Sequence, residues 1–60
     1  MSYFSELDIV RQETAGDPGA RMAASWSIAR EWWPGLRGTA LAYRAAKLHE
    51  MMDDADAGIA

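Results

Sequence analysis

The string from His49 to Asp53 (His-Glu-Met-Met-Asp) comes closest to a metal site in residue type and spacing. Its H-E-x-x order matches the zincin helix, with an aspartate where the second histidine would stand. A histidine and an aspartate at this spacing share a helix face and could both reach one metal ion. The sequence offers no third ligand nearby and no cysteine. We therefore expect no bound metal, and we interpret His49 as a residue near a helix C-terminus, where the helix dipole favours positive charge.

A second set of residues is basic. Arg37, Arg44 and Lys47, with Tyr43 among them, could form the face of a recognition helix in a helix-turn-helix protein. The link from Pro34 to Thr39 is longer than the turn of about three to four residues in that motif, and the sequence has no asparagine to read adenine. A small dimeric DNA-binding regulator is therefore the alternative reading, and nucleic-acid binding is not the expected function.

The three tryptophans, Trp26, Trp32 and Trp33, are the most unusual feature of so short a chain. On a helix, Trp32 and Trp33 point about 100° apart, so both cannot face one small core. Tryptophan and arginine are also over-represented at binding hot spots. One reading places Trp26 and Trp33 in the core and Trp32 over a loop. The other, which we adopt, predicts a partner-binding surface formed by Arg30, Trp32, Trp33, Arg37 and Tyr43.

Catalysis finds little support in the sequence. There is no cysteine nucleophile, and no serine stands in an obvious elbow to pair with the single histidine. No glycine-rich phosphate loop of the P-loop or dinucleotide-binding type is present. We therefore expect neither an enzymatic activity nor a cofactor.

Start and stop signals predict an all-α, three-helix unit forming a single domain over residues 1–60, with helices at about residues 5–15, 18–33 and 36–57. Ser5 and Asp8 read as a capping box that opens the first helix, and Gly16 is placed to end it. Asp17 and Pro18 suit the N-cap and first position of the second helix. We expect the second and third helices to form an antiparallel hairpin that the first helix crosses.

Helical spacing also predicts which faces are buried. The expected core residues of the second helix are Met22, Trp26, Ala29 and Trp33, widened by Ile28 and Trp32. Those of the third helix are Leu41, Ala45, Leu48 and Met52, extended by Met51 and Ala55. Pro34 should end the second helix, because a residue before proline is pushed out of the α region. Thr39 is a usable cap if the third helix starts late.

Charge is distributed unevenly along the chain. The net charge is −3, and the ends are acidic while residues 30–49 hold four basic residues against one glutamate. This layout indicates internal charge complementarity rather than a nucleic-acid surface, which would need a basic excess over the whole domain.

The apolar residues are few and small, since twelve of them are alanine. Without a disulfide or a metal, a chain of this length is expected to self-associate or to dock on a partner. No apolar run approaches the 18 or so residues of a membrane span, so a soluble, cytoplasmic protein is expected. Five arginines to one lysine and no asparagine are typical of a GC-rich bacterial or phage gene.

Together these features predict a small, non-enzymatic helical protein-interaction module. It could serve as a phage-encoded inhibitor of a host protein or defence complex, or as an accessory subunit of a larger assembly. The expected partner is another protein, a second copy of the chain, or both.

Overall fold

The computed structural model describes residues 3–58, of which residues 3–5 are described by their backbone alone, and contains three α-helices. They are α1 (Tyr3–Glu13), α2 (Pro18–Trp32) and α3 (Gly38–Gly58). No strand occurs within residues 3–58. The predicted all-α, three-helix fold is confirmed.

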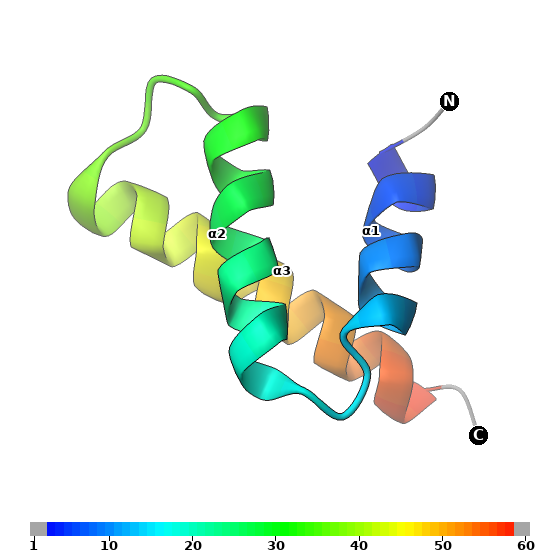
Figure 1. Cartoon of the computed structure of the whole chain (residues 1–60). Helices are drawn as coiled ribbons and strands as arrows, with labels where there is room; N and C mark the ends of the chain where they lie inside the picture. Colours follow the sequence, from blue (N-terminus) through cyan, green and yellow to red (C-terminus); the bar gives the residue numbers. More distant parts are fainter. Residues whose placement is uncertain (1–2, 59–60) are drawn as a thin grey trace.

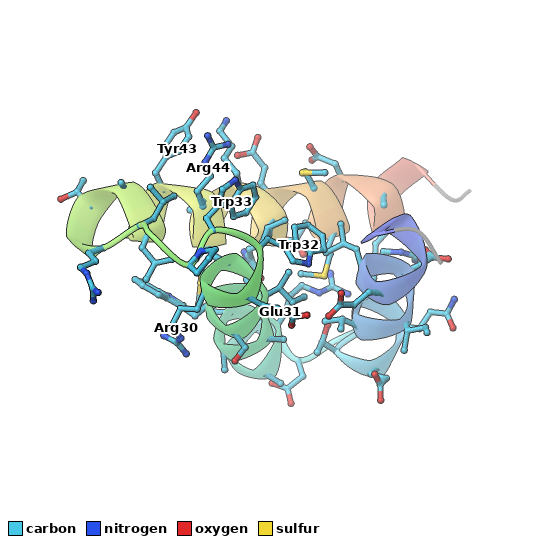
Figure 2. The ribbon with its side chains drawn as sticks, turned by 90° about the horizontal axis from the view of Figure 1, so that it is seen from above. Arg30, Glu31, Trp32, Trp33, Tyr43 and Arg44 are labelled. Carbon is cyan, nitrogen blue, oxygen red and sulfur yellow. The ribbon has the colours of Figure 1, made fainter. Side chains whose placement is uncertain are left out.

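The helices form two layers. In Figure 1, α1 and α2 lie side by side and run in opposite directions, and α3 crosses behind both of them. Figure 2, which looks along α1 and α2, shows both helices on the same side of α3. The prediction that α2 and α3 form an antiparallel hairpin crossed by α1 is therefore wrong, because it is α3 that crosses the other two helices. The link turns the chain sharply, because the Leu36 N–H bonds back to the Trp33 carbonyl at 3.0 Å and Gly38 adopts a φ of +55°.

The start of α1 differs from the prediction. The helix already includes Tyr3, so Ser5 lies inside it and cannot act as the N-cap, which requires a non-helical backbone. The last helical hydrogen bond runs from the Thr14 N–H to the Val10 carbonyl at 3.0 Å. The chain then turns at Gly16, with a φ of +77°. Gly16 thus ends the helical segment as predicted, although α1 itself stops at Glu13.

The start of α2 agrees with the prediction. The Asp17 side chain accepts a hydrogen bond from the Ala20 N–H at 3.1 Å, and Pro18 occupies the first turn. The helix ends at Trp32, one residue early, because Trp33 precedes Pro34 and leaves the helical region with φ −128° and ψ 70°. α3 starts at Gly38, so Thr39 is already helical and is not the cap.

The core lies where α2 crosses α3. Its buried members are Ile28 and Ala29 of α2 and Leu41, Ala45 and Leu48 of α3. Small side chains at the crossing allow the two helix axes to approach closely.

The predicted face of α3 is confirmed, because Leu41, Ala45, Leu48 and Met52 are all buried. Met51 and Ala55, which were expected to extend this face, are exposed.

The buried face of α2 is turned relative to the predicted stripe. Its buried residues are Arg21, Ser25, Ile28 and Ala29, whereas Met22, Trp26 and Trp33 are only half-buried. Two members of the real face are polar, so a count of apolar residues could not find it. The hydroxyl of Ser25 donates to the carbonyl of Arg21 at 2.8 Å, which satisfies it within the helix.

A buried guanidinium joins the three helices. Arg21 is 4% exposed, and its Nε donates to the Thr14 hydroxyl at 3.0 Å. One terminal nitrogen donates to the Arg11 carbonyl at 2.6 Å. The other donates to Asp53 at 2.7 Å and Asp56 at 2.6 Å, both on α3. We call these contacts the Arg21 network.

Charges in this region stabilise one another. Hydrogen bonds to Asp53 and then to Asp56 raise the pKa of Arg21. The pKa of Arg11 is likewise raised by its hydrogen bonds to Asp56 and Asp8. The acidic end of α3 is thus paired inside the molecule, as the charge layout indicated. Its short ion pairs, from Asp53 and Asp56, run to Arg11 and Arg21, which lie outside the basic segment 30–49. From that segment, Lys47 and His49 approach Glu50 and Asp53 at 3.8 Å.

Replacing Arg21 by methionine should lower the free energy of unfolding by about 2 kcal/mol, measured by urea denaturation. Removing one partner of a fully buried pair costs roughly 3 to 5 kcal/mol, and the loss is smaller here because Asp53 and Asp56 retain contact with water. Arg30→Met is the matched control, since Arg30 lies on the same helix but is exposed, and it should shift stability by no more than about 0.5 kcal/mol. Equal effects of the two substitutions would contradict a structural role for Arg21.

The second prediction concerns acid stability. Hydrogen bonds from Arg11 and then Arg21 hold the pKa of Asp56 below its ordinary value of 3.8. A carboxyl with a lowered folded-state pKa stabilises the fold above its unfolded-state pKa, and this stabilisation is lost as the pH falls through the folded-state value. The stability difference between the wild type and Asp56→Asn should therefore shrink as the pH is lowered from 7 to about 3.

Thermal melting at several pH values measures this difference. Asp54→Asn is the control, because Asp54 is exposed and has no ionic partner within the described chain; its melting curves should follow those of the wild type at every pH. If the stability difference between the wild type and Asp56→Asn stayed constant from pH 7 to about 3, Asp56 would not have the lowered pKa.

Candidate functional site

An open groove of about 470 Å³ lies where α2 ends and α3 begins. We call it the corner groove, and its side chains come from Arg30, Trp33, Pro34, Leu36, Arg37 and Leu41. Leu41 is buried, Trp33 and Leu36 are half-buried, and the two arginines are exposed. The groove therefore combines an apolar lining with cationic side chains that water can reach.

The backbone of the link positions these side chains. The Trp33 N–H donates to the Ala29 carbonyl at 2.9 Å, which ties Trp33 to the end of α2. The turn at Pro34 and Gly35 then brings Leu36 back towards α2. Gly38, which also borders the groove, takes a positive φ that a residue with a Cβ adopts only with strain. One tight turn and one glycine thus define the groove.

Aromatic and cationic side chains also meet beside the groove. The guanidinium carbon of Arg44 lies 4.8 Å from the centre of the Trp33 ring, within the range of a cation–π interaction. Lys47 lies 5.6 Å from the ring centre of Tyr43, which is exposed. Figure 2 shows Arg44 directly beside Trp33, with Tyr43 next to it. The Arg44 contact keeps one positive charge beside the corner groove, whereas Lys47 and Tyr43 are not among the residues that line it.

The structure brings together only part of the predicted partner-binding set. Arg30, Trp33 and Arg37 line one groove. Tyr43 points outwards from α3 beside Arg44 and away from Arg30 (Figure 2). It borders the same end of the molecule without lining the groove.

Trp32 lies on the other side of α2, between α2 and α1 (Figure 2). Its indole N–H donates to a Glu6 carboxylate oxygen at 3.4 Å, and its ring packs edge-on against Trp33 with the ring centres 5.9 Å apart. It is half-buried against the core. The structure therefore gives Trp32 a packing role within the molecule, and all three tryptophans contribute to the margin of the core.

Three lining residues, Pro34, Leu36 and Leu41, were absent from the predicted set. In the sequence, Pro34 indicates only the end of a helix, and the spacing of Leu41 indicates only a core position. Leu36 is a lone apolar residue between Pro-Gly and Arg-Gly. An apolar side chain isolated in a turn was the one available signal for a groove at this position.

The corner groove keeps its positive charge. No acidic side chain within the described chain forms an ion pair with Arg30, Arg37 or Arg44. The first turn of α3 holds no acidic residue, so the positive end of its dipole adds to the charge of the arginines. This end of the molecule is therefore suited to contact carboxylates.

His49 does not lie near a helix end. α3 continues to Gly58, so the prediction that His49 lies near a helix C-terminus and is favoured there by the helix dipole is wrong. Its Nδ1 is 3.8 Å from Asp53, and its buried Nε2 has no hydrogen-bond partner among the described residues. Asp53 is engaged by Arg21. Within residues 3–58 no three acidic or histidine side chains come close enough to hold a metal ion.

Comparisons with protein-family models, curated proteins and solved structures find no match to this chain. None of the helices in the described part of the chain combines the length and apolar character needed to cross a membrane.

Gly38 gives a direct test of the groove's backbone. A Cβ at Gly38 would meet no atom within 4 Å, so Gly38→Ala adds backbone strain and no collision. We expect a loss of about 1 kcal/mol in the free energy of unfolding. Gly35→Ala is the matched control in the same link, with equal space and no positive φ. It should be neutral or slightly stabilising, and a larger loss for Gly35→Ala would contradict the described turn.

Proposed function

We propose that the protein is a non-enzymatic protein-interaction module whose corner groove holds a segment of a partner protein. The observation that carries the proposal is the apolar lining of the groove with two unneutralised arginines beside it. Tryptophan and arginine supply much of the binding energy at protein interfaces. An arginine can also bind a carboxylate through two parallel hydrogen bonds, which favours a partner segment that carries acidic residues.

The shape and charge of the molecule favour a protein over other partners. A small-molecule site usually encloses most of its ligand, whereas the corner groove is open. A nucleic acid would be repelled by the acidic ends of a chain whose net charge is −3. An open groove with an apolar lining suits one or two side chains presented by a protein surface.

The module would act by occupying a surface of its partner. This mode of action fits a phage-encoded inhibitor of a host protein or defence complex, and it fits an accessory subunit of a larger assembly equally well. The arginine-rich composition supports a bacterial or phage origin, and we place the module in the cytoplasm of the bacterial cell.

Affinity capture from a lysate of the native bacterial host, followed by titration with the purified partner, tests this function. Arg30→Glu should weaken the complex at least tenfold, because it places a carboxylate in the groove. Lys47→Glu makes the same change in charge on the exposed side of α3 and should change affinity by less than about twofold.

Two results would contradict the proposal. One is a partner that binds Arg30→Glu as tightly as the wild type. The other is tight, salt-dependent binding to nonspecific duplex DNA that both charge reversals weaken alike, because that pattern indicates phosphate contacts.

A further inference from the structure

The water-facing side of α1 carries a large apolar residue between carboxylates. Ile9 is 56% exposed, and Asp8 and Glu13 beside it are also exposed. Glu13 has no ion pair within the described chain, and Asp8 keeps 59% of its side chain exposed although Arg11 contacts it. We call these three residues the outer face of α1. Arg11 bridges Asp8, at 2.6 Å, and Asp56, at 2.8 Å, so the unpaired negative charge of this face is that of Glu13.

The outer face of α1 and the corner groove lie at opposite ends of the molecule. In Figure 1, α1 lies at one end and the link between α2 and α3 at the other, and the molecule extends 36 Å along its longest axis. The two surfaces cannot meet within one chain. They can meet only between two copies.

The two surfaces are complementary in chemistry. One offers an isoleucine flanked by carboxylates, and the other an apolar groove flanked by Arg30 and Arg37. We propose that a second copy of the chain occupies the corner groove by placing Ile9 against its apolar lining, with Glu13 facing the arginines. The contact buries a large apolar side chain that is otherwise exposed to water. It also gives Arg30, Arg37 and Glu13 partners of opposite charge.

This contact joins unlike surfaces, so each added copy leaves one groove and one α1 free. Such head-to-tail association continues into a chain of copies or closes into a ring. This self-association uses the groove that the proposed function assigns to a partner protein. It goes beyond that function because it requires no other protein. A bound partner would compete with the second copy.

Two variants, each disabled on one surface, test the proposal. Arg30→Glu with Arg37→Glu reverses the charge of the groove, and Ile9→Ser with Glu13→Gln removes the apolar anchor and its negative charge without adding a cation that the reversed groove could attract. By sedimentation velocity, the wild type should exceed its monomer mass of 6.6 kDa as concentration rises, and salt should reverse the increase. Each variant alone should remain a monomer. An equal mixture should form a dimer and nothing larger, because only one working contact remains.

Two further measurements keep the outcome decisive. Circular dichroism should show unchanged helicity in both variants, since all four positions are exposed. Tyr43→Ser with Met51→Ser removes the large exposed apolar side chains of α3 and should leave the association unchanged.

A wild type that stays monomeric, a mixture that does not dimerise, or association lost through the α3 variant would each overturn the proposal. Partner capture by Ile9→Ser with Glu13→Gln distinguishes self-association from the proposed function. If this variant still captures the partner protein while the wild type does not self-associate, the proposed function is supported and the self-association proposal is contradicted.

Discussion

The guanidinium of Arg21 is the interaction on which the arrangement of the three helices depends. It starts from α2 and reaches the carbonyl of Arg11 at the end of α1, the hydroxyl of Thr14 just beyond it, and two carboxylates of α3. Among the α1 side chains that the structure describes, Leu7 and Val10 pack at the margin of the apolar core. The polar contacts of Arg21 add a directional constraint on the position of α1, because a buried charge tolerates few alternative geometries when each donor needs an acceptor.

The same contacts determine where positive charge remains. Asp53 and Asp56 are the carboxylates closest to Arg21, and Asp56 also pairs with Arg11. Because the end of α3 is used in this way, Arg30 and Arg37 at the far end of the molecule form no ion pair within the part of the chain that the structure describes. The ion pairs that fix α1 thus also leave the corner groove basic. The ion pairs at the end of α3 and the positive charge of the corner groove are therefore two results of the same distribution of charged residues.

The sequence predicts best what is encoded over short distances. The Asp17 cap with Pro18, the turn at Gly16 and the buried face of α3 all depend on neighbours within one or two helical turns. The buried face of α2 could not be found in this way, because Arg21 is buried only by virtue of acceptors up to 35 residues away. The crossing of the helices is likewise set by the link and by long-range packing. For the groove, composition identified Arg30, Trp33 and Arg37, but the position of Trp32 beside α1 depends on tertiary contacts with Glu6.

The hydrogen exchange rates of the arginine side-chain Nε–H groups, measured by NMR at neutral pH, test the central role of Arg21 most directly. The chain has five arginines, and they divide into the buried Arg21, the largely covered Arg11 and three that are exposed. We expect the Nε–H of Arg21 to exchange most slowly, because it is buried and bonded to Thr14. We expect the corresponding groups of Arg30, Arg37 and Arg44 to exchange at the rate of free arginine. Equally fast exchange at all five would contradict the account, because it would show that the Arg21 guanidinium is not held between the helices.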